Sequence, residues 1–364
     1  MNSETSPTVG ILILNYRHPE ETLACVRSLL AKEGPGSRIL WIENDAVSQD
    51  GRAERTLAAS GLPWVTVDPE RDSLPGPGIV GYISNPENLG YAGGNNVGLR
   101  YLVKCGIPYA WVLNNDTLLR VGSSRDLVIA AESRPEVGLW ATTITSDVHP
   151  NYLGGLVQLK DFAIRYISDI SLLEGDPHSY VSGCSMFLRT DLAESLGYIP
   201  DDYFLYYEDP AFSLEIRKRG LGLSAVPQVT VFHLENLSTG RRSLLTEYYC
   251  RRNRWTFIRR YFPEHFRKQA WRQFYIAQRL FFRLKFSRMR VEWLSVVDFL
   301  KERLGRTHRR CRSGTVRVSC SDTTPRCGPD PPRRWSAASS PTRYGSCWRR
   351  WRSGGRGRPG PGQR

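Results

Sequence analysis

The sequence predicts an α/β protein whose core is a doubly wound, mostly parallel sheet. Two observations support this class. Short apolar runs that suit strands alternate with amphipathic helical stretches as far as about residue 144, and such alternation is typical of parallel strands joined by crossover helices. Several of the apolar runs end in Asn, Asp or Glu, at the sheet edge where this class binds its ligands. A helical region and a basic tail follow.

The individual elements follow from local patterns. Val9–Leu14 is a continuous apolar run, as expected for a strand buried on both faces. A helical stripe begins at Pro19, because proline suits the first helical position. The remaining elements expected are strands over Ile39–Ile42, Trp64–Val67, Ile79–Ser84, Tyr109–Leu113, residues 137–144, Tyr180–Leu188 and Leu221–His233 (one or two strands), with helices over residues 90–104 and 122–133 and a loop entering a helix over Phe204–Arg219.

Charge divides the 364-residue chain into three regions. Residues 8–240 are expected to form the α/β domain, and residues 1–240 carry a net charge of −11. The helical region over residues 241–305 carries +12 and the tail over residues 306–364 carries +13. An acidic domain argues against nucleic acid as a partner, since a phosphate backbone selects a basic surface.

The tail changes composition abruptly. No Leu, Ile, Phe, Met, Lys, Glu or Asn occurs from Arg306 to Arg364, so this segment cannot build a core and is expected to be disordered. It is either a genuine basic tail or the product of a shifted reading frame, and the composition favours neither. The underlying DNA would decide between the two.

Location and partners are less clearly marked. The eight cysteines form no zinc or disulfide pattern, the first ten residues lack the features of a signal peptide, and no apolar run is long enough to span a bilayer. We therefore expect a cytoplasmic protein. The basic, aromatic residues 241–305 suit peripheral contact with the inner face of a membrane. A helical cap packed on the acidic domain is the alternative, and the oligomeric state is open.

Polar side chains follow the predicted strands at their carboxyl ends. Asn15, Glu43, Asn88 and Asp116 all lie at this edge, and Asp116 follows two asparagines. Mg²⁺ and Mn²⁺ prefer oxygen ligands, and one strand-end carboxylate suits a cation that bridges a diphosphate. A simple Asx turn is the alternative for this cluster.

A loop rich in glycine and asparagine, residues 85–96, opens the helix expected over 90–104. It includes Asn88, Gly93, Gly94 and Asn95. Glycine is costly inside a helix without a reason, and small residues at a helix start can expose N–H groups to a phosphate. The loop therefore predicts a phosphate-binding helix start.

A second acidic cluster ends in Glu208 and Asp209, after the aromatic run Tyr203–Tyr207. A carboxylate here can remove a proton from a hydroxyl, although acids at a helix start are also favoured by the helix dipole alone. His233 ends a predicted strand and can complete a metal site or serve only in packing.

The order of these motifs resembles the family 2 glycosyltransferases of the GT-A fold, over about residues 8–305. The motifs are NYR, ENDAVSQDG, NPENLGYAGGNNVGL, WVLNNDT, GCSMFLR, YFLYYEDPAFSLEIRKRG and VFHLENLS. EYYCRRNRW (Glu247–Trp255) further resembles a helical motif of the rhamnosyltransferase-like branch, which builds bacterial cell-surface glycans.

This resemblance implies an inverting transfer of a sugar, such as the deoxyhexose rhamnose, from a nucleoside diphosphate to a hydroxyl of a glycan or lipid-linked acceptor. It implies Asp209 as the catalytic base with Glu208 beside it, and Mg²⁺ or Mn²⁺ held by Asp116 and His233. The donor-binding residues it implies are Asn15, Glu43, Asn88, Gly93, Gly94, Asn95 and Asn115.

Three departures and two rival functions accompany the resemblance. The family usually has Asp at the position of Glu43, and it often has a second acid at the position of Ala211; residues 306–364 have no parallel.

A nucleotidyltransferase would use a similar sheet, but its early basic Gly-rich signature is absent from Val9–Pro19. A non-catalytic binding descendant would lose its acids, whereas Asp116 and Asp209 are both present.

Overall fold

The computed structural model describes residues 9–34, 37–234, 244–282 and 286–302. All of these residues belong to one compact unit. The tail over residues 306–364, expected to be disordered or frame-shifted, lies outside the described residues.

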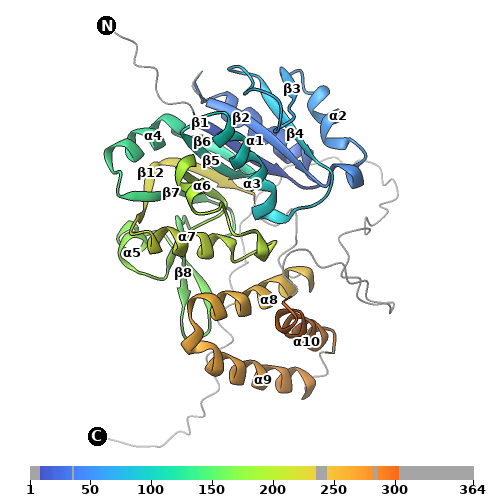
Figure 1. The fold of residues 1–364 in the computed structure, drawn as a ribbon, viewed down its shortest axis with the longest axis vertical. Helices are drawn as coiled ribbons and strands as arrows, with labels where there is room; N and C mark the ends of the chain where they lie inside the picture. The colour runs from blue at the N-terminus through green and yellow to red at the C-terminus, as the bar shows by residue number, and fades with distance from the viewer. Residues whose placement is uncertain (1–8, 35–36, 235–243, 283–285, 303–364) are drawn as a thin grey trace, which may run out of the picture. The chain divides into compact units, whose positions relative to one another are not determined.

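A nine-stranded sheet forms the centre of the described chain (Figure 1). Seven strands run in one direction, and β11 and β6 run against them. The expected mostly parallel α/β architecture is therefore confirmed. In spatial order the strands are β3 (Trp64–Thr66), β4 (Val80–Asn85), β2 (Ser37–Asn44), β1 (Val9–Asn15), β5 (Tyr109–Asn114), β11 (Ser185–Arg189), β7 (Val137–Thr145), β12 (Gly222–His233) and β6 (Thr117–Val121).

The sheet is covered on both faces because its central strands are apolar throughout. Every residue of β1 is buried. Its odd-numbered side chains, such as Ile11, pack with helices α1, α2 and α4, while Leu12 and Leu14 pack with α3, α6 and α7 on the other face. Burial on both faces explains the unbroken apolar run in the sequence.

The helices that cover the sheet are α1 (Pro19–Leu30), α2 (Arg52–Ala58), α3 (Gly90–Lys104), α4 (Ser124–Ser133), α6 (Thr190–Ser195) and α7 (Glu208–Lys218). Short 3₁₀ turns are η1 (Ala46–Gln49) and η2 (Asp201–Tyr203). The extent of α3 matches the expectation. Helix α4 begins two residues later than expected, where Ser123 and Asp126 form a capping box.

The segment expected as one strand over Tyr180–Leu188 is two strands in different sheets, so that expectation is wrong. Strand β10 (Ser179–Val181) joins a small antiparallel sheet with β8 (Gly154–Gln158) and β9 (Ala163–Ile167), followed by α5 (Ile170–Gly175). A turn closed by the hydrogen bond from Ser185 N to Ser182 O separates it from β11. The apolar run is continuous in sequence, which conceals the turn.

In the part of the chain that the structure describes, three helices follow the sheet: α8 (Leu244–Tyr261), α9 (Phe266–Phe282, after the 3₁₀ turn η3, Pro263–His265) and α10 (Phe286–Leu300). Phe257 and Ile258 of α8 pack with Tyr207 and Phe162, so α8 does cap the α/β region. Across the described residues, no helix is both long enough and apolar enough to cross a membrane.

Candidate active site

Strand pairing brings Asp116 and His233 together from positions far apart in the chain. Asp116 lies between β5 and β6, and β6 pairs antiparallel with the end of β12, with Thr117 opposite His233. Leu234 N also donates to Asp116 O at 3.0 Å. As a result His233 Nε2 lies 3.2 Å from Asp116 Oδ1, and both side chains are largely buried.

This pair offers a carboxylate oxygen and an imidazole nitrogen to a divalent cation. Burial alone would lower the pKa of His233, but Cys184 and Asp116 together raise it. The described residues contain no group of three His, Cys, Asp or Glu side chains arranged around a metal. A small number of protein ligands is nevertheless usual for Mg²⁺, which takes its other ligands from water and substrate phosphates.

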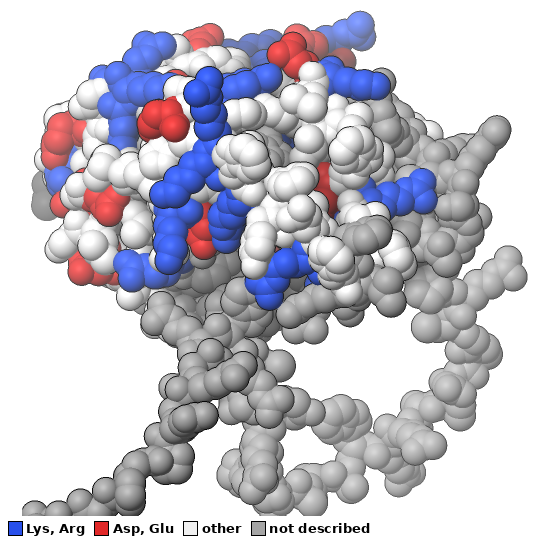
Figure 2. Space-filling model, turned by 90° about the horizontal axis from the view of Figure 1, so that it is seen from below, with Lys and Arg blue, Asp and Glu red and all other residues white. Residues whose placement is uncertain are grey.

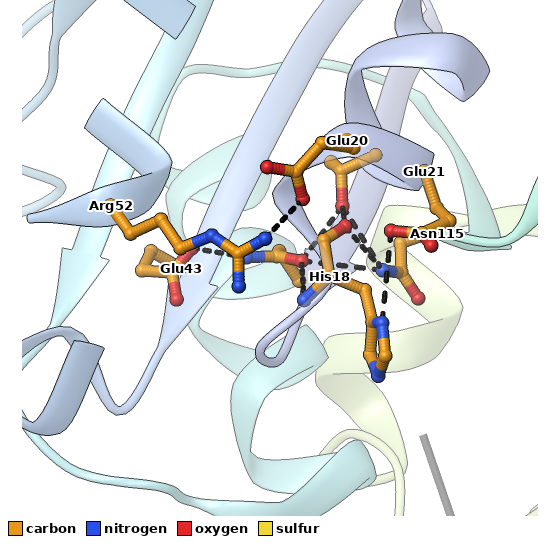
Figure 3. A network of polar contacts seen from close by, with 8 residues as sticks. His18, Glu20, Glu21, Glu43, Arg52 and Asn115 are labelled. Carbon is orange, nitrogen blue, oxygen red and sulfur yellow. Dashed lines mark hydrogen bonds and ion pairs between the residues drawn. The ribbon is translucent and has the colours of Figure 1, made fainter. Parts of the chain in front are cut away.

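A polar network at the end of β1 includes His18, Glu43 and Asn115 (Figure 3), and Asn15 connects them. Its Nδ2 donates to Glu43 Oε2 at 2.5 Å, and its Oδ1 accepts from Thr22 Oγ1 at 2.8 Å and Asn115 Nδ2 at 3.3 Å. Asn115 Nδ2 also reaches His18 O. The structure thus brings together three of the residues expected to bind the donor, from β1, β2 and the segment after β5.

Glu43 is 1% exposed, and no hydrogen bond of normal geometry reaches its Oε1. Burial raises the pKa of Glu43 to about 7, against the lowering effect of the Asn15 and Trp41 side chains. Asp45 Oδ2 is likewise buried without a partner. Buried polar atoms are normally satisfied, so these oxygens are suited to receive N–H or O–H groups of a ligand.

The loop before α3 does not offer its first N–H groups to a phosphate, which corrects that part of the expectation. Leu89 N donates to Asn44 Oδ1, Gly90 N to Asn88 Oδ1, and Tyr91 N to Phe204 O. Asn88 therefore shapes the loop directly. Because Asn88 Oδ1 already accepts from Gly90 N, any contact of Asn88 with the donor would use another atom of its side chain.

The glycines of α3 have a packing reason. A Cβ on Gly94 would meet Leu14 Cδ1 at 2.5 Å, and one on Gly90 would meet Phe204 O at 2.3 Å. They allow the helix to lie close to β1 and to the loop before α7. Gly93 and Asn95 are buried nearby, and Asn95 Oδ1 has no partner. A donor-binding role for Gly93, Gly94 and Asn95 stays a prediction.

Glu208 and Asp209 begin α7 and differ in environment. Glu208 is buried, and burial together with the Asp209 charge raises its pKa well above the ordinary value. Burial raises the pKa of Asp209 only to about 6, because Gly183 N donates to Asp209 Oδ2 at 3.1 Å. Both pKa values are raised, and the smaller rise makes Asp209 the more acidic member of the pair.

The turn between β10 and β11, residues 182–184, connects the two acidic centres. Gly183 N donates to Asp209 Oδ2, and Asn114 N donates to Cys184 O at 3.0 Å. The Cys184 side chain raises the pKa of His233. Tyr91 Oη donates to Gly183 O, and a Cβ on Gly183 would lie 3.3 Å from that hydroxyl. Sequence reasoning assigned no role to Gly183 or Tyr91, although the glycine lies in the GCSMFLR motif.

Helix α8 holds the loop that leads into α7. Asn253 Nδ2 donates to the carbonyl oxygens of Tyr203, Leu205 and Tyr206 at 2.7–2.8 Å, and the Arg252 guanidinium donates to Tyr203 O at 2.7 Å. Both side chains are 0% exposed. The loop needs such support, because Phe204, Tyr206 and Tyr207 have φ of 66°, 69° and 75°, which are costly for residues with side chains.

Replacing Asn253 by alanine should therefore lower both stability and turnover. Three buried carbonyl groups would lose a donor, at a cost of about 1–3 kcal/mol in the free energy of unfolding. We expect kcat to fall while the KM for the donor changes little, since the affected loop positions Glu208 and Asp209. Urea unfolding and steady-state kinetics measure the two effects. Arg259→Ala, an exposed change on the same helix, is the control; an unchanged kcat in Asn253→Ala would remove the positioning role.

Comparisons with known proteins give distant similarities. No protein-family model matches the chain. The chain is 23% identical over 237 residues to the low-salt glycan biosynthesis hexosyltransferase Agl10 of Haloferax volcanii; the alignment covers 62% of this chain and 66% of that protein, just under two thirds of its length.

Two solved structures are partly similar in fold. One is GalNAc-T7 with UDP, GalNAc and Mn²⁺, with a TM-score of 0.49 and 14% identity, covering 68% of this chain and 48% of that chain. The other is the mannosyltransferase PcManGT of Pyrobaculum calidifontis in complex with GDP-Man and Mn²⁺, with a TM-score of 0.47 and 13% identity, covering 82% of this chain and 76% of that chain.

Proposed function

We propose that this chain is a metal-dependent, inverting glycosyltransferase of the GT-A fold that transfers a sugar from a nucleoside diphosphate to a hydroxyl group. The observation that carries the proposal is the turn over residues 182–184, which joins a candidate cation pair, Asp116 and His233, to a candidate base, Asp209. Transfer from a diphosphate to a hydroxyl needs both centres near one another. The distant relationship to a hexosyltransferase of glycan biosynthesis supports the same reaction class.

The donor would bind at the carboxyl ends of β1, β2 and β5. Glu43 would accept from the nucleoside through its buried Oε1, and Asn15 holds the other oxygen of that carboxylate. Asp116 and His233 would hold Mg²⁺ or Mn²⁺, which would neutralise charge on the diphosphate. Glu43, Asn15 and Asn115 would orient the donor, and this positioning supplies much of the acceleration.

Asp209 would act as the base. Its pKa is raised less than that of Glu208, and its carboxyl group is fixed by the N–H of Gly183. It would remove the proton of the acceptor hydroxyl as the new bond to the anomeric carbon forms and the bond to the diphosphate breaks. Glu208, whose pKa burial raises well above the ordinary value, would orient the acceptor by a hydrogen bond. One displacement without an enzyme nucleophile inverts the anomeric configuration.

The substrates proposed are a hexose or a deoxyhexose such as rhamnose, on a glycan or lipid-linked acceptor. Nuclear magnetic resonance of the product tests the mechanism, because the one-bond coupling at the anomeric carbon reports its configuration. The proposal expects the configuration opposite to that of the donor. Retention would contradict the single displacement, and release of nucleoside diphosphate without any glycoside would contradict transfer itself.

A further inference from the structure

Helix α9 packs with its polar side inward. Gln269 and Gln273 are 3% and 6% exposed. Gln269 Nε2 donates to Lys160 O at 3.0 Å, and Gln273 Oε1 accepts from Arg254 at 2.6 Å while its Nε2 donates to Glu292. A helix on the surface of a soluble domain normally buries its apolar side instead. The arrangement leaves the apolar side of α9 facing outward.

The outward side is an aromatic stripe. Its members are Trp271, Phe274, Tyr275 and Phe282, which are 75%, 58%, 58% and 80% exposed. The other three follow Trp271 by three, four and eleven residues, which places all four on one side of a helix. Scattered exposed aromatics need no explanation, but a contiguous row on one helix indicates a binding surface.

Basic side chains accompany the aromatic stripe. Helix α9 contains Arg267, Lys268, Arg272 and Arg279 and no Asp or Glu. At 100° per residue, Lys268, Arg272 and Arg279 form one flank of the stripe and Arg267 lies within it. Arg272 also lies 3.6 Å from Asp161. The view from below shows white surface beside blue Lys and Arg side chains, with red Asp and Glu side chains among the blue ones (Figure 2).

We infer that the aromatic stripe of α9 docks on an anionic lipid surface. Three partners could cover this surface: a second copy of the chain, the chain beyond residue 305, or an anionic bilayer. Their charges distinguish them. A second copy using the same surface would bring two rows of Lys and Arg together, and the chain beyond residue 305 carries +13, so both are repelled. An anionic bilayer attracts the basic flank, and its interface accepts Trp, Phe and Tyr side chains.

This inference goes beyond the proposed function and does not depend on it. It would also explain how an acceptor on a lipid carrier reaches the enzyme. Because the docking surface contains none of the residues proposed for catalysis, binding to vesicles can be measured without turnover. Loss of vesicle binding with transfer to a soluble acceptor intact would separate the two proposals, as would the reverse result.

Co-sedimentation of the full-length chain with vesicles tests the inference. The vesicles are phosphatidylcholine with and without phosphatidylglycerol. Trp271→Ser with Phe274→Ser should abolish the salt-resistant part of binding to the anionic vesicles. Arg267→Glu with Lys268→Glu should weaken binding at least about tenfold, from the attraction of each basic residue to such a surface. Every variant keeps residues 303–364, so their charge contributes equally.

Matched controls change other exposed positions. Val121→Ser with Ile129→Ser removes two apolar side chains that are 55% and 58% exposed on β6 and α4, and Lys32→Glu with Arg125→Glu reverses two exposed charges. Both controls should bind like the parent. Equal binding by all variants, or equal binding to neutral vesicles, would overturn the inference. A dimer in light scattering that Trp271→Ser abolishes would assign the surface to a second copy instead.

Discussion

Replacing Asp209 by asparagine should lower turnover by about 10²–10⁴-fold, the usual contribution of a positioned general base. Asparagine keeps the size of the side chain and can still accept from Gly183 N, but it cannot take up the hydroxyl proton. Donor affinity should stay nearly unchanged, because Asn15, Glu43 and Asp116 are untouched. Steady-state kinetics and donor titration measure the two quantities.

The matched control is Glu208→Gln. Burial raises the pKa of Glu208 well above the ordinary value, which favours the neutral form that glutamine resembles, so the effect should be mild. In the parent enzyme kcat/KM should fall as the pH drops below about 6, since Asp209 becomes protonated there. Near-normal turnover in Asp209→Asn together with a collapse in Glu208→Gln would reverse the two roles, and the missing acid at Ala211 would then be the reason.

Replacing Asp116 by alanine should lower turnover by at least about 10²-fold, because a bound cation contributes several kcal/mol of charge stabilisation in the transition state. Removal of divalent ions with a chelator should have the same effect on the parent enzyme, and Mn²⁺ or Mg²⁺ should reverse it. In Asp116→Ala, added metal should restore little.

Two comparisons control this prediction. Asp191→Ala changes an aspartate that is 82% exposed at its side chain, on α6, and should behave like the parent. His233→Ala should weaken metal activation, since His233 lies beside Asp116. Full activity of the parent in excess chelator would exclude the cation and leave the Asp116–His233 pair with a structural role.

Local sequence patterns predict the first half of the fold well. The apolar run of β1 and the stripe of α3 are long and periodic, and their positions are confirmed. Asn15 and Asp116 lie at the carboxyl ends of strands, as expected. Parallel strands in a doubly wound sheet share this edge, so the position follows from the fold class alone.

Long-range pairing accounts for most of what the sequence could not show. The contact of His233 with Asp116 depends on β6, whose five residues Thr117–Val121 have too short a pattern to identify as a strand and whose partner is more than a hundred residues away. The small sheet containing β8 and β9 was missed for a different reason, since these two strands pair locally over residues 154–167. Its exposed strand β9 carries no apolar alternation.

Charge patterns were misleading at one position. Arg252 lies in a basic segment, and arginine is seldom fully buried, so the sequence suggests a solvated side chain. In the structure Arg252 is 0% exposed and donates to Tyr203 O. The aromatic residues of α9 show the opposite case, because their side chains are exposed where a packed helix would bury them.

Calorimetric titration of the parent enzyme with nucleoside diphosphates, with and without Mn²⁺, tests the central claim most directly. The panel is the diphosphates of uridine, guanosine, thymidine, adenosine and cytidine. The account predicts saturable binding of at least one of them that requires Mn²⁺ and is lost in Asp116→Ala. It also predicts that Asp209→Asn binds that nucleotide like the parent. Binding that is unaffected by both Mn²⁺ and Asp116→Ala, or absence of binding across the whole panel, would contradict it.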